Sequence, residues 1–443
     1  MIKSKINRRH FLKTLGIGAA AIAASPASIW FTNKSGGRPN VIVILTDDQG
    51  TVDVNCYGAK DLITPNMDAL AERGTRFTQF YVGAPICSPS RAALLTGRFP
   101  QRAQLPGNAV GDRGMPAAQV TIAEILKQYG YRTGVFGKWH LGTVLPLSPN
   151  EQGFDEFLGH KEGCIDNYSH FYYWRGPNRH DLWKDEQEIW ENGKYFPDII
   201  VREAKRFLEE NKDNPFFLFL PFNTPHYPMQ AEQKFVNMYE NIKDPNRKRY
   251  AAFVTSLDDK IGQVIAKLDE LKIRENTIVI FMSDHGHSVE KRAFGGGGSA
   301  GPFRGHKKTM WEGGIRVPSI ISWPGHIPEG AVRDQLACSI DWLPTIAEYC
   351  GVKLPNRKMD GKSIVPLINS SNGKTPHDIM HWMLGKSWAV RQGKWKLVYD
   401  NELFLSNMEK DITETINLAG SFPEIVKRLK SLHTEWAKEV EKQ

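Results

Sequence analysis

The chain has 443 residues, of which 41% are hydrophobic and 24% are charged, a composition typical of a globular enzyme. It is long enough for one large α/β domain and a smaller second one. The formal net charge of +8 includes five cations near the N-terminus, and without them 52 basic residues face 49 acidic ones, a charge of +3. The bulk charge therefore gives no reason to expect a nucleic-acid partner.

The N-terminal segment has the three parts of an export signal. A positive region is followed by a short apolar run, Thr14–Ala24, and then by small residues. The run is too short to span a bilayer, so we interpret it as part of a signal peptide, and the full three-part pattern disfavours a basic disordered tail. "NRRHFLK" resembles a twin-arginine (Tat) signal. We expect residues 1–28 to be read by the Tat machinery and the mature protein, with no transmembrane anchor, to be periplasmic or secreted.

Strand and helix patterns alternate after a polar joint that precedes residue 40. Strands are predicted within 41–50, 132–137, 215–223 and 277–286, and helices at 64–74, 121–130, 197–211 and 251–273. This alternation predicts an α/β fold, with a large, doubly wound, mostly parallel sheet and helices on both faces. We assign residues 38–360 to this catalytic domain and expect its site at the carboxyl ends of the strands.

The C-terminal part changes character, with a boundary expected near 345–375. Short antiparallel strands are predicted within 387–400 and 402–407, followed by a closing amphipathic helix at 423–442. Residues 375–443 are therefore predicted to form a smaller antiparallel-sheet subdomain. The glycine-rich stretch "FGGGGSAGPFRG", 294–305, is expected to be a mobile loop.

Five cysteines are present, and none forms a C-x-x-C pair or a zinc-like cluster with histidine. An odd number leaves at least one thiol unpaired in an exported protein, and we expect it to be Cys87. The sequence does not determine whether Cys56, Cys164, Cys338 and Cys350 form disulfides.

Cys87 lies in "APICSPSRAALLTGR", where Pro85 and Pro89 interrupt helical structure around it. The pattern predicts a turn at Cys87 and a helix directly after it, with Arg91 in the first turn. A helix N-terminus and a guanidinium group both favour an anion. The residues alone leave three interpretations open: an activated thiolate, an anion cradle, or an ordinary buried cysteine.

Carboxylates end two of the predicted strands. Asp47 and Asp48 follow the first strand, and Asp284 with His285 follows the strand at 277. An Asp pair after a strand also suits a turn or a helix cap. Two such groups on separate strand ends nevertheless favour a divalent cation, and hard oxygen ligands suit Ca²⁺.

The stretch "CSPSRAALLTGR" resembles the signature of type I sulfatases in the alkaline phosphatase superfamily, Cys-x-Pro-x-Arg followed by Thr-Gly-Arg. "GYRTGVFGKWHLG", 130–142, resembles their second signature, and the likeness covers nearly the whole mature chain. It implies that a formylglycine-generating enzyme converts Cys87 to formylglycine. It also implies that the hydrated aldehyde attacks the sulfur of a sulfate ester.

The resemblance also implies the other site residues. Asp47, Asp48, Asp284, His285 and residue 87 would hold Ca²⁺, with Mg²⁺ possible because many members carry Asn where this chain has His285. Asp284 would also take a proton from the diol.

The remaining roles concern the sulfate group and its ester oxygen. Arg91 would stabilise the diol oxyanion, and Lys138, His140 and Lys307 would contact the sulfate. We expect Lys138 and His140 to project to the same side of an extended segment. His226 would protonate the leaving alcohol, and His140 would later remove the second diol proton. Whether Lys308 reaches the site is left open.

The aromatic, basic segment 166–183 is expected to contribute to the substrate rim through Trp174, Arg175, Arg179 and His180, together with the glycine-rich loop. Stacking on sugar rings would suit a sulfated carbohydrate, whereas a folded insertion covering its own core is the alternative. Neither the sugar nor the sulfate position follows from the sequence.

Three other functions remain under consideration. The nearest is a phosphate or phosphonate ester hydrolase of the same superfamily. A catalytically silent glycan-binding protein would keep Cys87 unmodified. A thiol enzyme is disfavoured because no histidine lies in a partnering motif within the Cys87 turn.

Overall fold

The computed structural model describes residues 37–173 and 177–441, and the chain forms one compact unit from Arg38 onward. The predicted signal peptide, residues 1–28, lies outside the described residues. Within the described part, no helix combines the length and the apolar character needed to cross a membrane.

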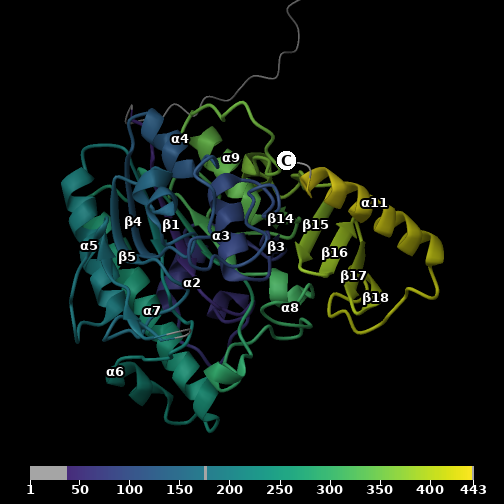
Figure 1. Cartoon of the computed structure of the whole chain (residues 1–443), viewed down its shortest axis with the longest axis horizontal. Helices are drawn as coiled ribbons and strands as arrows, with labels where there is room; N and C mark the ends of the chain where they lie inside the picture. Colours follow the sequence, from purple (N-terminus) through teal and green to yellow (C-terminus); the bar gives the residue numbers. More distant parts are fainter. Residues whose placement is uncertain (1–36, 174–176, 442–443) are drawn as a thin grey trace, which may run out of the picture. The chain divides into compact units, whose positions relative to one another are not determined.

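A ten-stranded sheet forms the centre of the unit, in the order β13-β2-β12-β11-β1-β10-β4-β5-β8-β9 (Figure 1). Five neighbouring strands run parallel: β11 (Thr277–Ser283), β1 (Asn40–Thr46), β10 (Phe216–Pro221), β4 (Arg132–Lys138) and β5 (Glu156–His160). The edges are β12 (Ser319–Ser322), β2 (Thr75–Phe77), β13 (Ala331–Arg333), β8 (Trp183–Lys184) and β9 (Gln187–Glu188). Because β12 and β8 pair antiparallel with the central strands, the sheet is mixed but mostly parallel, as predicted.

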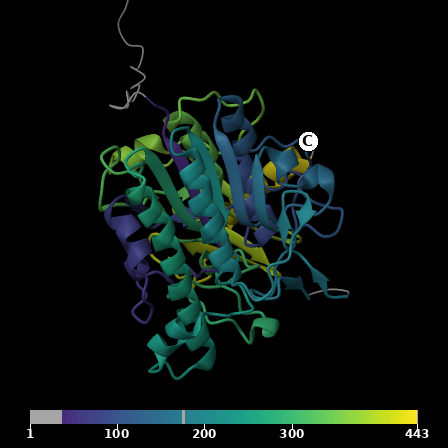
Figure 2. The same ribbon diagram turned by 90° about the vertical axis from the view of Figure 1, so that its left-hand side faces the viewer.

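Alternation along β1 divides the interior into two layers. Val41, Val43 and Leu45 belong to one apolar core, and Ile42 and Ile44 to the other. The first core includes α3 (Cys87–Thr96), α4 (Ile122–Gln128) and α9 (Trp342–Tyr349), and the second α2 (Pro65–Glu72), α5 (Phe196–Asn211) and α7 (Pro245–Glu270). A strand buried on both faces reads as a continuous apolar run, which is what the sequence shows. Helices on both faces of the sheet are thus confirmed (Figure 2).

Helix boundaries follow local capping. In α4 the Thr121 side chain accepts from the Glu124 amide, and the Glu124 side chain accepts from the Thr121 amide, a capping box. Helix α7 begins at Pro245, earlier than predicted, because Asp244 caps it and proline suits the first helical position.

Several further strands and α-helices before the C-terminal sheet are short. They are β3 (Phe80–Tyr81), β14 (Ala337–Cys338), β6 (Phe171–Tyr172), β7 (Arg179–His180), α6 (Gln233–Val236), α8 (Glu312–Ile315) and α10 (Val365–Asn369).

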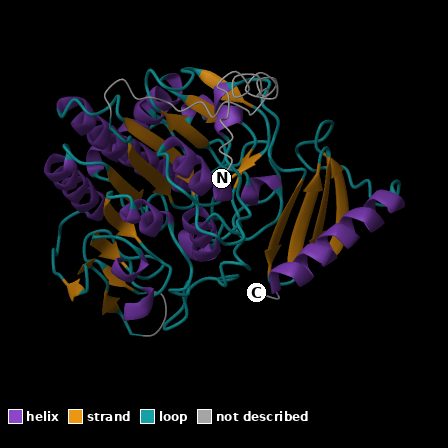
Figure 3. Ribbon diagram, turned by 90° about the horizontal axis from the view of Figure 1, so that it is seen from above, coloured by secondary structure: helices purple, strands orange, loops and turns teal. Residues whose placement is uncertain are grey.

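The C-terminal region is a four-stranded antiparallel sheet with α11 (Pro423–Glu441) along it (Figures 1 and 3). Its strands are β15 (Ile379–Leu384), β16 (Ser387–Gln392), β17 (Trp395–Asp400) and β18 (Glu402–Asn407). The predicted antiparallel sheet and closing helix are confirmed, and β15 is an additional strand. The domain boundary stays a prediction, since Trp382 Nε1 donates to the Val82 carbonyl at 2.8 Å across it.

All five cysteines are described, and all are unpaired. The question that the sequence left open about Cys56, Cys164, Cys338 and Cys350 is therefore answered by free thiols in this structure.

The glycine-rich stretch is anchored, which corrects the expectation of a mobile loop. The Ser299 amide donates to Asp53 Oδ2 at 2.7 Å, and Arg247 Nη1 donates to the Gly297 carbonyl at 2.8 Å. A Cβ on Gly297 would lie 2.6 Å from the Asn246 carbonyl oxygen. The glycines allow close backbone approach rather than motion.

Candidate active site

Cys87 is the first residue of α3 rather than part of a turn before it. Pro89 is tolerated inside the helix because amides in the first turn have no intrahelical acceptor. Arg91 consequently lies in the second turn, not in the first as predicted. Gly97, with φ of 63°, ends the helix in the left-handed conformation.

The two polar strand ends lie side by side because β1 and β11 are neighbours in register. Thr46 pairs with Ser283, the last residues of the two strands. Asp47 and Asp48 follow the first, and the Asp284 amide donates back to the Thr46 carbonyl at 2.9 Å. The parallel sheet therefore brings together carboxylates that are far apart in the sequence.

Four of the predicted ligands converge. One donor atom each from Asp47, Asp48, Cys87 and His285 lies within 4.8 Å of the others, and all four residues are buried. Cys87 Sγ is 3.2 Å from His285 Nε2. Within the described residues, both carboxylate oxygens of Asp48 are buried without a hydrogen-bond partner, and Oδ1 forms an ion pair with Lys307 Nζ at 2.7 Å. Carboxylate oxygens and an imidazole nitrogen that converge on one point are ligands a divalent metal ion can use, so the donor set fits such an ion.

Asp284 lies beside this group but is not one of the four. Its Oδ2 accepts from Arg91 Nε at 3.2 Å and Nη2 at 2.9 Å, while Oδ1 is 3.4 Å from His285 Nε2. Arg91 Nη1 also donates to the Lys138 carbonyl at 3.0 Å. Arg91 thus ties α3 to the ends of β11 and β4.

Two lysines face the first carboxylate pair. Lys138, the last residue of β4, places Nζ 2.5 Å from Asp47 Oδ2. Lys307 Nζ is 2.7 Å from Asp48 Oδ1. With Arg91, three buried cations meet three buried carboxylates, and an anionic ligand would find ammonium groups already in place.

These charges shift the ionisation of the centre. Burial raises the pKa of the Cys87 thiol, but the positive charges of Lys138 and Lys307 outweigh burial and lower this pKa to about 5. Burial lowers the pKa of His285, but Asp284 and Cys87 raise it to about 9. The position of residue 87 therefore stabilises negative charge on that side chain.

The two predicted catalytic histidines are both close to the centre. His226 Nε2 is 3.6 Å from Asp48 Oδ2, and its Nδ1 is 2.7 Å from the Tyr227 carbonyl. His140 has φ of 54°, so the extended conformation from which we predicted a common side for Lys138 and His140 ends before His140. Lys138 is fully buried against Asp47, whereas His140 lines the cleft.

Burial keeps both histidines neutral. For His140, burial together with Lys138 and Arg91 holds the pKa well below its usual value. For His226, burial outweighs the opposing effect of Asp47, so its pKa is also lowered.

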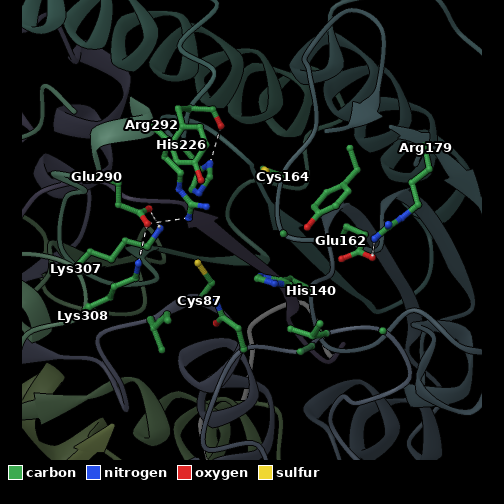
Figure 4. A pocket seen from close by; sticks show the side chains of 18 residues that line it. Cys87, His140, Glu162, Cys164, Arg179, His226, Glu290, Arg292, Lys307 and Lys308 are labelled. Carbon is green, nitrogen blue, oxygen red and sulfur yellow. Dashed lines mark hydrogen bonds and ion pairs between the residues drawn. The ribbon is translucent and has the colours of Figure 1, made fainter. Parts of the chain in front are cut away.

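A cleft of about 640 Å³ opens above Cys87. In Figure 4, Lys307, Lys308 and Glu290 lie on one side of Cys87 and Glu162 and Arg179 on the other. The cleft is lined by Ile86, Cys87, Asn108, Ala109, Val110, Gly111, His140, Glu162, Gly163, Cys164, Tyr172, Arg179, His226, Tyr227, Glu290, Arg292, Lys307 and Lys308.

Several lining residues were not identified from the sequence. Glu290 Oε1 is 2.7 Å from Lys308 Nζ, and Arg292 lies over the Tyr227 ring at 5.0 Å. Burial raises the pKa of Glu290, but Lys307 and Lys308 lower it to about 2. The sequence signal that could have identified them is their position, since this charged run closely follows His285, two residues after the end of β11. Lys308, left open above, does reach the cleft.

The predicted rim is only partly placed there. Arg179 lines the cleft, pairs with Glu162 and lies 4.4 Å over the Tyr172 ring. His180 is not among the described lining residues: it faces the other side of β7 and stacks on Trp190 at 3.8 Å, because neighbours on a strand point to opposite faces.

The other rim candidates also differ from expectation. Trp174 and Arg175 lie outside the described residues. The glycine-rich residues 295–299 line a separate surface hollow with Arg247 and Asp61, not the cleft. That part of the predicted rim is therefore wrong.

Comparison with protein families gives two matches. The family described as Sulfatase matches residues 39–352, and the one described as N-sulphoglucosamine sulphohydrolase, C-terminal, matches residues 301–440. Human arylsulfatase A is 35% identical over 89% of this chain and 87% of its own length. Pig N-acetylgalactosamine-6-sulfatase is 34% identical over 88% of this chain and 75% of its own length.

Solved structures share the fold. Ps i-CgsB in complex with k-i-k-neocarrahexaose superposes with a TM-score of 0.84 and 33% identity, covering 90% of this chain and 92% of that one. A phosphonate monoester hydrolase of Agrobacterium radiobacter has a TM-score of 0.63 at 20% identity, covering 89% of this chain and 96% of that one, a likeness of fold alone.

Proposed function

This chain belongs to the sulfatase family, and from that membership we propose that it hydrolyses sulfate esters on carbohydrates at a formylglycine formed from Cys87. As a family member it is a sulfuric ester hydrolase. The observation that carries the proposal is the convergence of Asp47, Asp48, Cys87 and His285 at the base of a cleft into which Lys307 reaches.

The family implies a metal ion and a formylglycine, and the residues present fit both. Asp47, Asp48, His285 and residue 87 would hold the cation, with Asp284 beside them. When present, the cation polarises oxygens bound to it, and the hydrated aldehyde supplies the hydroxyl that attacks sulfur. Carboxylate oxygens favour Ca²⁺, whereas the imidazole of His285 is an uncommon ligand for it, so Mg²⁺ is the alternative.

Charged side chains of this chain would stabilise the sulfate group and move the protons. Lys307 lines the cleft beside residue 87, and the buried Lys138 lies close enough to lower the pKa of the Cys87 thiol, so both would stabilise negative charge that grows during attack at sulfur. Arg91 holds Asp284 through two hydrogen bonds, and we assign to this carboxylate the proton taken from the diol. His140, held neutral by burial and nearby cations, suits removal of a proton in the step that releases sulfate.

His226 suits proton transfer to the leaving alcohol once substrate is bound. The Tyr227 carbonyl can only accept, so Nδ1 carries the ring proton and Nε2 of the neutral ring has none to give. A sulfate ester beside the ring adds a negative charge that favours the imidazolium form. We therefore infer that substrate binding charges His226 for its role.

Two kinds of observation support a carbohydrate substrate. Relatives include an N-acetylgalactosamine-6-sulfatase, and a structural neighbour was solved with k-i-k-neocarrahexaose. In this chain the cleft offers Tyr172 and Tyr227 rings and the Arg179 guanidinium, groups that stack on sugar rings and hold hydroxyl or anionic substituents.

Export and maturation partners are part of the proposal. The residues 1–28 support delivery by the twin-arginine pathway to the periplasm or beyond it. Because that pathway carries folded cargo and residue 87 is buried in the fold, the formylglycine-generating enzyme would act before export.

The test is turnover on a panel of defined sulfated mono- and oligosaccharides. We expect Lys307→Ala and His226→Ala each to lower kcat/KM by roughly 100-fold or more on the best substrate. The exposed Lys291→Ala variant is the matched control and should be unaffected. Full turnover in both site variants would show that the roles are misassigned.

A phosphate or phosphonate ester hydrolase is the second candidate, because the buried ammonium groups of Lys138 and Lys307 would also suit a tetrahedral phosphate group. Matched sulfate and phosphate esters of one sugar decide between them by kcat/KM. A silent glycan-binding protein would show an unmodified thiol when the mass of the peptide containing residue 87 is measured.

A further inference from the structure

Three buried charged groups meet where the C-terminal sheet packs on the main sheet domain. Lys396, on β17, places Nζ 2.8 Å from Glu312 Oε1 and 2.9 Å from Glu414 Oε1. None of the three side chains is exposed to solvent. A charge is stable in such surroundings only when it is paired, so Lys396 serves as counter-ion to Glu414 and, together with Arg316, to Glu312.

Glu312 is held by its backbone as well as by its side chain. Its amide donates to Glu414 Oε2 at 2.7 Å, and its Oε2 accepts from Tyr81 Oη at 2.7 Å. Arg316 Nη1 donates to the same carboxylate at 3.2 Å. The start of α8 is therefore clamped between the main domain and the C-terminal region.

The C-terminal region also holds the beginning of the segment that leads to Glu312. The Arg304 guanidinium lies 3.6 Å over the Trp311 ring and 4.8 Å from the Phe404 ring. Its Nη1 donates to the Glu414 carbonyl at 3.1 Å, and its own carbonyl accepts from the Gly313 amide at 2.7 Å. Segment 304–313 is thus closed by a hydrogen bond between its ends, and both Arg304 and Glu312 contact Glu414.

Lys307 lies inside that loop, and its position depends on the residues after Glu312. A Cβ on Gly314 would lie 2.6 Å from the His306 carbonyl oxygen and 2.2 Å from that of Thr309. The Gly314 carbonyl in turn accepts from the Gly286 amide at 3.1 Å, directly after His285. Gly314 therefore packs between the turn that contains Lys307 and the residues after β11, and no side chain would fit at this position.

The same turn contacts the segment just before α3, the helix that begins with Cys87. The Lys308 amide donates to the Pro85 carbonyl at 2.7 Å, and the Lys307 amide donates to the His287 carbonyl at 2.9 Å. A shift of Glu312 would thus be passed by backbone contacts to the Lys307 ammonium, which Figure 4 shows beside Cys87.

The contacts among Glu312, Lys396 and Glu414, called the clamp below, depend on the positive charge of Lys396. Burial raises the pKa of Glu312, but Lys396, Arg316 and Arg391 lower it to about 2, so this carboxylate is ionised. Burial and the nearby Glu312 raise the pKa of Glu414 to about 7 in spite of Lys396. Without the lysine, two buried carboxylates would face each other.

We propose that Lys396 and Glu414 are positioning residues that set the place of Lys307 at the active centre through Glu312. This inference rests on the proposed function, in which Lys307 contacts the sulfate group. It assigns the C-terminal sheet a part in sulfate binding although none of its residues lines the described cleft.

The experiment compares Lys396→Met and Glu414→Ala with the exposed control Lys394→Met. The readouts are kcat and KM on a sulfated sugar, the dissociation constant of inorganic sulfate by calorimetry, and the melting temperature. We expect both clamp variants to lose roughly 10- to 100-fold in kcat/KM and to bind sulfate more weakly. Glu414→Gln, which still accepts from the Glu312 amide, should retain more activity than Glu414→Ala.

The outcomes separate positioning from plain stabilisation. Folded clamp variants with a lower melting temperature but wild-type kcat, KM and sulfate affinity would overturn the inference. If Lys396→Met does not fold, the kinetics and sulfate affinity of Glu414→Ala test the inference, since this variant leaves Lys396 paired with Glu312. Wild-type kinetics in Lys307→Ala would instead contradict the proposed function, whereas an inactive Lys307→Ala beside unaffected clamp variants rejects the positioning alone.

Discussion

Arg91 is the cation around which the buried carboxylates are arranged. Its guanidinium lies 2.9 Å from Asp284 Oδ2 and 3.4 Å from Asp47 Oδ2, and almost none of it is exposed. A guanidinium with fixed, planar donors can hold two carboxylates at once, which an ammonium group does less well. Arg91 therefore contributes to stability as well as to the site.

We expect Arg91→Met to lower the free energy of unfolding by about 3–5 kcal/mol, because Asp284 loses its buried counter-ion. Chemical denaturation measures this loss. The exposed Arg73→Met serves as control and should change stability little. A site variant as stable as the wild type would show that water or another group replaces the guanidinium.

At the scale of elements, the closing helix packs on the C-terminal sheet through two uncharged histidines. His433 on α11 stacks on Trp388 at 4.4 Å, and His381 on β15 stacks on Trp436 at 4.7 Å. Burial, with His433 adding to it, lowers the pKa of His381 to about 3, and burial lowers that of His433 to about 4. Among the residues that the structure describes, Nδ1 of each ring has no hydrogen-bond partner.

These histidines should make the C-terminal region acid-sensitive. The unfolded chain takes up protons at both sites below about pH 6.5, while the folded chain does so only near pH 3–4. The contribution of these two histidines to the free energy of unfolding is therefore fully present above about pH 6.5 and is lost as the pH falls from there towards pH 3–4. We expect His433→Phe to reduce the decrease in melting temperature between pH 7 and pH 5, relative to the exposed control Thr434→Val. An unchanged pH dependence would contradict the assignment.

The elements themselves were largely readable from periodicity. Continuous apolar runs at β1, β10 and β11 predicted buried parallel strands, and 3.6-residue spacing predicted α5 and α7. The helix start at Cys87 was missed because Pro89 suggests a break, although proline is acceptable in a first turn. Short strands such as β15 and the β6–β7 hairpin depend on their partners and left little local signal.

At the scale of the whole molecule, cation binding should be coupled to folding. The donor group Asp47, Asp48, Cys87 and His285 exists only in the folded chain, since its members come from three separated segments. A ligand that binds only the native state stabilises it by about 2.7 kcal/mol at 100 times its dissociation constant.

We therefore expect chelator to lower the melting temperature and Ca²⁺ to restore it, with Mg²⁺ compared at the same concentration. Asp48→Asn should lose most of this response because its carboxylate lies in the donor group, whereas the exposed Asp112→Asn should keep it. A melting temperature independent of chelator and of both cations would reject a bound metal ion in the purified protein.

Taken alone, the amino-acid order determined the features that depend on neighbours along the chain. These are the polar ends of β1 and β11, the segment around Cys87 and the parallel sheet that brings them together. The strand ends converge because parallel strands in one sheet share their carboxyl edge, so their chemistry could be predicted without coordinates.

Only the tertiary structure decided which charges meet across the fold. It paired Asp284 with Arg91, turned His180 onto Trp190, added Glu290 and Arg292 to the cleft and buried Lys396 between Glu312 and Glu414. Such contacts join segments far apart in sequence, and the path of the chain sets which side chains become neighbours. No local pattern carries that information.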